Sequence, residues 1–330
     1  MESIVSIRAL AKDHAGEKAL KGISIEVPDP CLFGLIGADG AGKSTLMSIL
    51  ATLSDGDSGE VRMLGHDLRK EFHSIRKDIG YMPQRFSLYQ DLSVLENLDF
   101  FADIFGITGK AKSIRMEHLL GFAGLTTFKS RRAGLLSGGM KQKLALACTL
   151  VHQPRLLLLD EPTVGVDPVA RKDFWNMLKS LRAQGVSLIV STPYMDEAAL
   201  CDSLALLHQG SVLAHGSPKD MLAAYPYRLH RVDASADAKV STLNYPGDKA
   251  PPPGFALIYP SGGSLHAAEP PDQPGDALQR LRSAVPGAGS ATLIQPSLED
   301  CFFSLLSGKM GTGEPEKGIL KKDRKPKGKA

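Results

Sequence analysis

The chain has 330 residues, 43% of them hydrophobic and 23% charged, which is enough apolar material for one large core or two smaller ones. Lys and Arg number 39 against 36 for Asp and Glu, so the formal net charge of +3 excludes the strongly basic signature of a nucleic-acid binder. No stretch approaches the roughly 18 apolar residues of a membrane-spanning helix, and we expect no secretory signal at the start "MESIVSIRAL". The four cysteines form no CxxC pair, which favours reduced thiols over a zinc site or a disulfide framework.

The first part of the chain predicts strands, a loop and a helix. Alternating apolar residues in "IVSIRAL" and "GISIEVP" indicate half-buried strands of an antiparallel sheet. The run "CLFGLIG" indicates a fully buried strand, which leads through the glycine-rich "GADGAGKS" into "TLMSILATL", a segment with helical spacing.

The second part predicts further strands and helices. Residues from about 90 to 150 are mostly helical in pattern, and the buried strands "RLLLLDEP" and "VSLIVST" follow, separated by the amphipathic "PVARKDFWNMLKSLRAQG". This order predicts βαβ units with parallel strands. Prolines and glycines crowd residues 245–276, which predicts loops or a domain boundary. Beyond them "DALQRLRSAV" has a helical pattern, "ATLIQP" a strand pattern and "SLEDCFFSLLSG" a helical one, and the basic "KGILKKDRKPKGKA" is typical of a flexible tail.

Residues 37–44 fit the phosphate-loop pattern G-x-x-x-x-G-K-[ST]. Backbone N–H groups of such a loop wrap a phosphate chain, while Lys43 would reach the β- and γ-phosphates and Ser44 would bind Mg²⁺. A purely structural glycine turn is disfavoured, because the motif lies between a predicted strand and a predicted helix. The predicted nucleotide-binding residues here are Gly37, Ala38, Asp39, Gly40, Ala41, Gly42, Lys43, Ser44 and Thr45.

Two further patterns carry polar chemistry. In "RLLLLDEPT" a buried strand ends in Asp160, which would hold Mg²⁺ through water, and Glu161, a candidate general base. In "LLSGGMKQKLALA", Ser137, Gly138 and Gly139 open a helix that would form a second phosphate-binding end. Taken alone, the acids read equally well as solvated side chains and the serine as an ordinary helix N-cap.

Taken in order over about residues 3–220, these motifs resemble those of the ATP-binding subunit of an ABC transporter. "GADGAGKS" is similar to the Walker A loop, "YMPQ" with Gln84 to the Q-loop, "LSGGM" to the signature, "LLLLDEP" to Walker B and "VGVD" with Asp167 to the D-loop. The resemblance implies a P-loop NTPase of the α/β class, a RecA-like core with an antiparallel β subdomain and a helical signature subdomain. It also implies a catalytic and Mg²⁺-binding role for Gln84, and a nucleotide-binding role for Asp167. It further implies a head-to-tail dimer that holds ATP between Walker A of one chain and the signature of the other.

The expected domains are an ABC ATP-binding domain at 1–224, with a helical subdomain at about 88–145, a small α+β accessory domain at 225–308 and a flexible basic tail at 309–330. Within the family the motifs are most similar to those of ABC-2 type exporters, in particular the first half of tandem ATP-binding subunits that work with a periplasmic adaptor. This resemblance implies a transmembrane permease as partner, no nucleic acid, and a peripheral position at the cytoplasmic face of the inner membrane. Phe86, Leu88 and Tyr89 in "FSLYQDL" are candidate contacts with the permease, unless they are core residues.

The sequence departs from the family at three places. His14 stands near the position of the aromatic residue that usually stacks on adenine, and it is a poorer platform that reads more readily as a surface residue. The signature has Met140 where many members have Gln. Pro193 replaces the His that touches the γ-phosphate, and proline has no hydrogen-bond donor of its own.

The segment after the strand at 186–192 nevertheless predicts a sound helix start. Thr192 would cap the helix, Pro193 would occupy its first position, and Asp196 and Glu197 would favour its first turn. Thr192 or Tyr194 would be the only substitute donors nearby. We therefore expect a weakened ATP site on this chain and pairing with a second ATP-binding chain, more readily a different one than a copy of this one.

Two other functions remain open from the sequence. A mainly regulatory module, in which ATP drives association with little hydrolysis, is compatible with Pro193. A soluble ABC protein without a transport role is less compatible, because such relatives usually carry two ABC units, long coiled coils or zinc sites, and none is visible. The sequence does not name a transported substrate.

Overall fold

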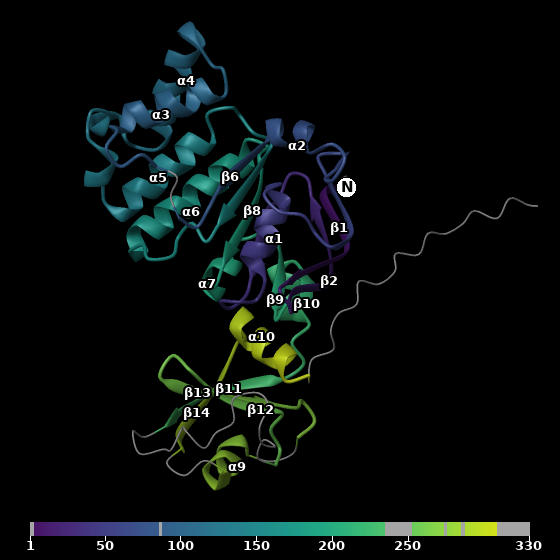
Figure 1. Cartoon of the computed structure of the whole chain (residues 1–330). Helices are drawn as coiled ribbons and strands as arrows, with labels where there is room; N and C mark the ends of the chain where they lie inside the picture. The colour runs from purple at the N-terminus through teal and green to yellow at the C-terminus, as the bar shows by residue number, and fades with distance from the viewer. Residues whose placement is uncertain (1–2, 86–87, 235–252, 274–275, 285–287, 309–330) are drawn as a thin grey trace, which may run out of the picture.

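The computed structural model describes residues 3–85, 88–234, 253–273, 276–284 and 288–308 (Figure 1). In the larger part, an antiparallel sheet has the strand order β2-β1-β4-β5, formed by β1 (Ser3–His14), β2 (Glu17–Pro28), β4 (Ser58–Met63) and β5 (His66–Asp67). A central sheet has the order β10-β9-β3-β8-β7-β6, formed by β3 (Leu32–Ile36), β6 (Ile79–Met82), β7 (Leu156–Asp160), β8 (Ser187–Thr192), β9 (Ser203–His208) and β10 (Ser211–Gly216).

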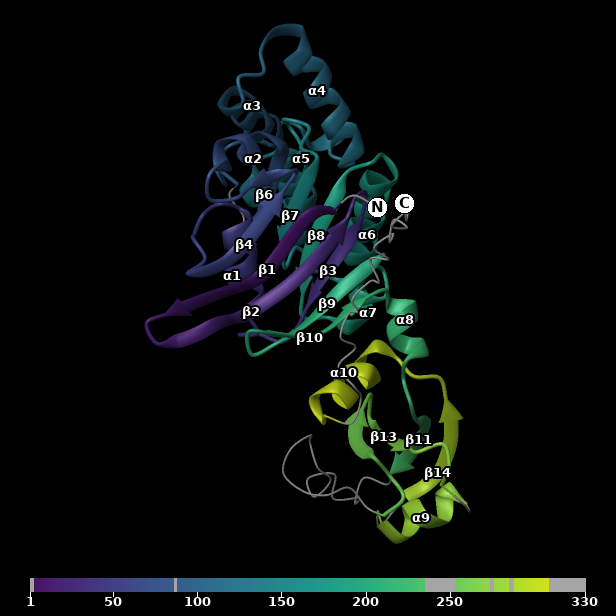
Figure 2. The ribbon, with the colours of Figure 1, turned by 90° about the vertical axis from the view of Figure 1, so that its right-hand side faces the viewer.

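Helices connect and cover these strands. Those of the larger part are α1 (Lys43–Leu50), α2 (Phe72–Asp78), α3 (Val94–Ile104), α4 (Gly109–Phe122), α5 (Gly138–Thr149), α6 (Pro168–Ala183), α7 (Met195–Ala198) and α8 (Pro218–Ala223), with the short 3₁₀ turns η1 (Thr126–Phe128) and η2 (Ala133–Leu135). Figure 1 shows α1 between the central sheet and the antiparallel sheet, with α5 and α6 on the other side of the central sheet. Figure 2 looks onto the antiparallel sheet, whose long strands β1 and β2 lie in front.

The central sheet follows from continuous apolar runs. Strands β3, β7 and β8 are buried along their whole length. The strand β8 pairs in parallel with both β3 and β7, whereas β10 pairs antiparallel with β9. Such all-apolar strands suit a sheet that is covered on both faces. Because parallel strands point the same way, the residues that follow β3, β7 and β8 lie at one edge of the sheet, where open α/β sheets bind ligands.

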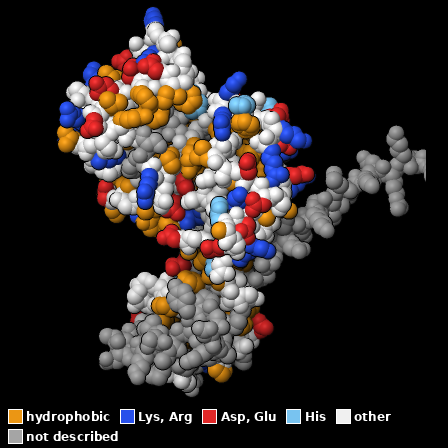
Figure 3. All heavy atoms as spheres, viewed as in Figure 1, with side chains coloured by type: hydrophobic (Ala, Val, Ile, Leu, Met, Phe, Trp, Pro, Cys, Tyr) orange, Lys and Arg blue, Asp and Glu red, His pale blue; other side chains and the backbone are white. Residues whose placement is uncertain are grey.

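The helices α3 and α4 form a lobe beside the core (Figure 1). The helix α3 begins with a capping box in which Ser93 Oγ accepts from the N–H of Glu96 and Glu96 accepts from the N–H of Ser93. Figure 3 shows hydrophobic side chains gathered over this lobe, and Ile104 and Tyr89 are 60% and 47% exposed. Leu88, in contrast, is buried in the core, so of the two interpretations of this residue the structure supports a core residue and not a permease contact. Phe86 lies outside the described residues.

The C-terminal elements form a smaller unit. Its antiparallel sheet has the order β12-β13-β11-β14, formed by β11 (Arg228–Ala234), β12 (Leu257–Ser261), β13 (Ser264–Glu269) and β14 (Ala288–Ile294). The helix α9 (Ala277–Ala284) packs on one face through Leu281, and α10 (Leu298–Leu306) packs on the other. The segment 245–276, for which the sequence predicts loops or a domain boundary, also contains the paired strands β12 and β13, which the turn Gly262–Gly263 joins. The predicted tail at 309–330 lies outside the described residues.

A polar cluster fixes the beginning of α10. Asp300 is 1% exposed and accepts hydrogen bonds from Tyr259 Oη, from His266 Nδ1 (2.7 Å) and from the N–H of Ser297 (2.6 Å). Burial alone raises the pKa of Asp300, but the hydrogen bonds from His266, Ser297 and Tyr259 prevail and hold that pKa below its usual value. A buried carboxylate thus ties α10 to the sheet of the small unit.

Within the described ranges, no helix has both the length and the apolar character required to cross a membrane. The four cysteines are buried and unpaired, as the sequence predicts. Burial raises the pKa of the Cys31 thiol to about 12, so this thiol stays protonated near neutral pH.

Candidate functional site

The loop between β3 and α1 is wrapped around its own lysine. Lys43 is only 3% exposed, and its Nζ donates hydrogen bonds to the carbonyl oxygens of Gly37 (2.8 Å) and Ala38 (3.0 Å). Gly40 and Gly42 have φ angles of 77° and 104°, a region that favours glycine, so the turns of the loop need these residues. Because α1 begins at Lys43, the positive end of a helix lies beside the loop.

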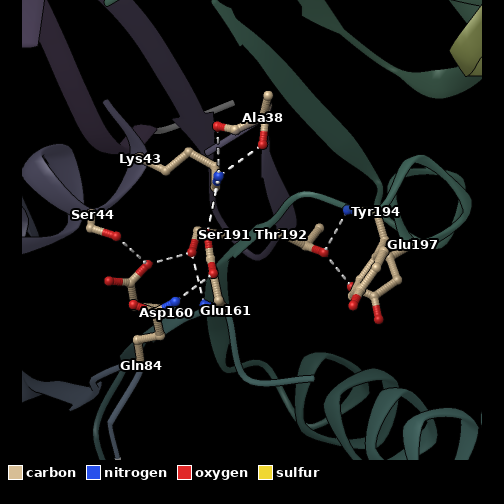
Figure 4. A network of polar contacts seen from close by, with 11 residues as sticks. Ala38, Lys43, Ser44, Gln84, Asp160, Glu161, Ser191, Thr192, Tyr194 and Glu197 are labelled. Carbon is tan, nitrogen blue, oxygen red and sulfur yellow. Dashed lines mark hydrogen bonds and ion pairs between the residues drawn. The ribbon is translucent and has the colours of Figure 1, made fainter. Parts of the chain in front are cut away.

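Two carboxylates lie next to this loop, at the carboxyl end of β7 (Figure 4). Ser44 Oγ donates a hydrogen bond to Asp160 Oδ1 (3.3 Å). Gln84 Nε2 donates to Glu161 Oε2 (2.8 Å), and Lys43 Nζ forms an ion pair with Glu161 Oε1 (3.0 Å). The fold therefore brings these predicted site residues together from segments that are far apart in the sequence.

A cavity of about 830 Å³ opens in front of these groups. Predicted site residues form much of its wall: Asp39, Gly40, Gly42, Lys43, Ser44, Thr45, Gln84 and Glu161. His14, at the end of β1, and Gln209, in the turn between β9 and β10, also line it. Ala41 is buried behind the wall. His14 thus lies at the cavity, but it is exposed to solvent. The residue that departs from the family pattern therefore stands where the cavity wall is open.

The predicted signature and D-loop residues do not line this cavity. Ser137 is the N-cap of α5, where its Oγ accepts from the N–H of Met140 (3.3 Å). A Cβ atom on Gly139 would lie 2.5 Å from Cβ of Ala170, so packing against α6 requires glycine there. Gly138 has open space around it.

The D-loop residue caps the next helix. Asp167 Oδ1 accepts from the N–H groups of Val169 (3.1 Å) and Ala170 (3.0 Å) at the start of α6. Val169 is 73% exposed beside it. Ser137, Gly138 and Asp167 are therefore exposed, whereas Gly139 is buried against α6. All four lie at helix starts and outside the cavity beside the phosphate loop.

The segment after β8 differs from the expectation. The helix α7 begins at Met195 with Tyr194 as its N-cap, so Pro193 is not its first residue and Thr192 is not its cap. Thr192 Oγ1 instead donates to Glu197 Oε2 (2.5 Å) and accepts from the N–H of Tyr194 (3.1 Å). The buried Glu197 carboxylate needs such hydrogen-bond partners. Because the Thr192 hydroxyl is bonded to this carboxylate, it does not cap the helix, and the helix begins later than predicted.

Glu197 also connects this segment to the D-loop region. It is 1% exposed and accepts from Thr163 Oγ1 (2.7 Å), while the Arg171 guanidinium lies 3.7 Å away. The same guanidinium lies over the ring of Tyr194, 4.3 Å from its centroid. The hydroxyl of Thr192 and the ring of Tyr194 are thus engaged with α6 and α7, on the side away from Lys43 (Figure 4).

Sequence reasoning misses two residues of this region, Ser191 and the buried role of Glu197. Ser191 Oγ bonds to Asp160, the last residue of β7, and to the N–H of Glu161, which follows it. The only sequence signal was a hydroxyl at the end of the apolar run "LIV", which also fits an ordinary strand end.

Nearby, burial and then the charge of Asp160 raise the pKa of Tyr81, which lies on β6.

A glycine-rich loop between a buried strand and a helix, with two carboxylates at the carboxyl end of another parallel strand of the same sheet, defines the P-loop nucleotide-binding class. The ABC transporter family model matches residues 20–164. The probable multidrug ABC transporter ATP-binding protein YbhF of Escherichia coli is 44% identical over 321 residues, which cover 97% of this chain and 54% of YbhF. The Nod factor export ATP-binding protein I of a Rhizobium species is 40% identical over 314 residues, which cover 93% of this chain and 98% of that protein.

The chain therefore belongs to the family of ABC transporter ATP-binding proteins, and it spans about half the length of YbhF. Solved structures support the fold. The protein cbiO1 of Clostridium perfringens, part of the ABC transporter complex cbiONQ, matches with a TM-score of 0.63 and 27% identity over 68% of this chain and 92% of its own. A dimeric ATP-binding cassette bound to ADP and phosphate matches with a TM-score of 0.58 and 27% identity over 63% and 96%. The predicted P-loop NTPase fold is confirmed.

Proposed function

We propose that this chain binds ATP with Mg²⁺ and hydrolyses it to power a membrane exporter of the ABC-2 type. The observation that carries the proposal is the convergence of Lys43, Ser44, Gln84 and Glu161 on one cavity. Asp160 lies directly behind them, bonded to Ser44. The names of its relatives, a multidrug ABC transporter protein and a Nod factor export protein, support the direction of transport.

Each residue has a role that its chemistry supports. The backbone of Gly37–Thr45 would cradle the phosphates, and Lys43 would leave Glu161 to contact them. Glu161 would then be free to accept a proton from the attacking water. Each of these steps uses a group that already lies at the cavity.

The donor set beside the loop fits Mg²⁺. Ser44 Oγ, an oxygen of Asp160 and the amide oxygen of Gln84 are hard ligands of the kind that this ion takes, together with water. When bound, the ion would neutralise charge on the phosphates. The oxygens of Ser44 and Asp160 are already close to each other, so the protein would need little rearrangement to hold it.

The chain would work with a second ATP-binding chain. Ser137, Gly138, Gly139 and Asp167 lie outside the cavity, so they would complete the nucleotide site of a partner, and the partner's signature would complete this one. Pro193 leaves this chain's own site without the usual switch donor. We therefore favour an asymmetric pair, in which the site built on this Walker A loop is the weaker one.

The remaining partner would be a transmembrane permease at the cytoplasmic face of the inner membrane, with a periplasmic adaptor in the assembled complex. Tyr89, 47% exposed, and the apolar side chains of the α3–α4 lobe are the surface we assign to the permease (Figure 3). Nothing in the composition supports a nucleic-acid partner.

The decisive experiment is purification of the tagged chain from detergent-solubilised membranes. We expect a permease and a second ATP-binding chain to copurify in fixed proportion. Recovery of ribosomes without a permease would overturn the exporter proposal and favour a soluble ABC protein.

A second candidate is a regulatory module that uses ATP binding alone. The engaged state of the Thr192 hydroxyl favours it, because this removes one of the two donors that could replace the switch His. Single-turnover hydrolysis in the complex, with Glu161→Gln as the baseline, distinguishes the two: equal rates with intact ATP binding support the regulatory candidate.

A further inference from the structure

Ser191, near the end of β8, bonds to both carboxylate-bearing residues of the site. Its side chain is fully buried, with 0% exposure. Its Oγ donates a hydrogen bond to Asp160 Oδ1 (2.5 Å) and accepts one from the N–H of Glu161 (2.9 Å), as Figure 4 shows. One hydroxyl therefore fixes both a carboxylate oxygen and the backbone that carries the next carboxylate.

The backbone of Glu161 needs this support. Its φ angle is 50°, in the left-handed region that a non-glycine residue adopts only at a cost of about 1 kcal/mol or more. The N–H of Glu161 is held by Ser191 twice, through Oγ (2.9 Å) and through the carbonyl oxygen (3.1 Å). The conformation directs the Glu161 side chain towards Lys43 and Gln84.

The hydroxyl is not needed merely to join the strands. Backbone pairing between β7 and β8 already places Asp160 beside Ser191, and this pairing continues along the whole of β7. The oxygen of Asp160 that Ser191 contacts, Oδ1, is the one that also faces Ser44 Oγ (3.3 Å). The bond from Ser191 thus sets the direction in which Asp160 presents its carboxylate.

We propose that Ser191 is a positioning residue for the nucleotide site: it orients Asp160 towards the metal ion and fixes Glu161 in the backbone conformation that faces the phosphates. This inference rests on the proposed function. Partners that orient a metal ligand typically contribute about 10- to 100-fold to metal affinity, so loss of this hydroxyl will be visible in metal binding itself.

The test uses Mn²⁺ as a paramagnetic substitute for Mg²⁺. Electron paramagnetic resonance measures the binding of Mn²⁺ to a stoichiometric complex of the full chain with ATP. For Ser191→Ala we expect the Mn²⁺ concentration at half-saturation to rise about 10-fold or more. ATP affinity in EDTA, measured by equilibrium dialysis, should stay within about 3-fold of wild type. Ser191→Thr retains the hydroxyl and should recover most of the Mn²⁺ affinity.

Ser187→Ala is the matched control. Ser187 lies on the same strand, is also 0% exposed, and donates a hydrogen bond to a carboxylate, Asp29 Oδ1 (2.7 Å), remote from the cavity. Ser187→Ala should lower the melting temperature about as much as Ser191→Ala does, but it should leave Mn²⁺ binding unchanged. Mn²⁺ titrations of Ser191→Ala that superimpose on wild type, or an equal weakening in Ser187→Ala or Ser191→Thr, would overturn the inference. A wild-type chain that does not bind ATP would instead overturn the proposed function.

Discussion

Pro193 illustrates how one residue can be sound for the fold and costly for the chemistry. The structure places it between the end of β8 and the N-cap of α7, where its missing N–H leaves no helix hydrogen bond unmade. The neighbouring hydroxyl of Thr192 is engaged with Glu197. Neither the proline nor the threonine therefore offers a donor to a γ-phosphate.

Pro193→His should restore activity to this chain's own site. A single well-placed donor to a transition state contributes about 10²- to 10³-fold in rate, so single-turnover hydrolysis should rise by an amount in this range. Hydrolysis of radiolabelled ATP by the assembled complex is the measurement. An unchanged rate, together with a large loss in Tyr194→Phe, would show that Tyr194 already supplies the donor.

The ion pair between Lys43 and Glu161 implies competition between carboxylate and phosphate for one lysine. Both side chains are nearly buried, at 3% and 7% exposure, and the phosphates would have to replace the carboxylate. In Glu161→Gln the lysine loses this competitor and the phosphates lose a neighbouring negative charge. ATP affinity should therefore rise about 10-fold while hydrolysis falls, as equilibrium dialysis and phosphate release can measure. Weaker ATP binding in this variant would contradict the competition.

At the level of elements, strands with a continuous apolar run were predictable, and strands without one were not. The runs ending in Ile36, Asp160 and Thr192 are buried strands as the sequence indicates, because continuous apolar character fits only a covered sheet. The strand β6 has four residues, including Gly80, and offers no period to read. The strands β12 and β13 were not predicted, because the surrounding prolines and glycines indicate turns. Such residues do not exclude paired strands between the turns.

The candidate site was predictable to the extent that its residues lie in linear motifs. The phosphate loop and the Asp160–Glu161 pair follow from spacing, and their convergence follows from parallel pairing. Ser191 and Glu197 could not be found in this way, because their importance depends on tertiary hydrogen bonds and no local pattern records those.

The docking of α10 depends on Asp300 and gives a pH prediction. The pKa of Asp300 is lowered in the folded chain from its ordinary 3.8, so its contribution is complete above that value and is lost as the pH falls below it. Asp300→Asn should lower the free energy of unfolding by about 2 kcal/mol near neutral pH. In urea denaturation the gap to wild type should be constant between about pH 8 and pH 5 and should narrow below about pH 4. A gap that already narrows between pH 8 and pH 5 would contradict the assignment of this stability to the Asp300 carboxylate.

For the whole molecule, the separation of the phosphate loop from the signature predicts unequal effects of two substitutions. In an asymmetric complex the active site would use this chain's Gly138 and the partner's Walker A loop. Gly138→Asp, at an open surface position, should therefore reduce steady-state hydrolysis by the complex at least 10-fold, whereas Lys43→Ala should reduce it only about 2-fold. Copurification of the partner chains controls for assembly. A larger loss in Lys43→Ala than in Gly138→Asp would contradict the asymmetry.

The smaller C-terminal unit shares an apolar core with the ATP-binding part of the chain. Ile36, at the end of β3, and Leu206 of β9 lie in one buried cluster with Leu229, Tyr259 and Phe303 of the smaller unit. A chain cut after α8 would therefore expose apolar side chains directly beneath the phosphate loop, and exposed patches of this kind promote aggregation. The isolated ATP-binding domain would then be a poor reagent, and drug screens or crystallisation trials that use it would examine a surface that the intact protein keeps covered.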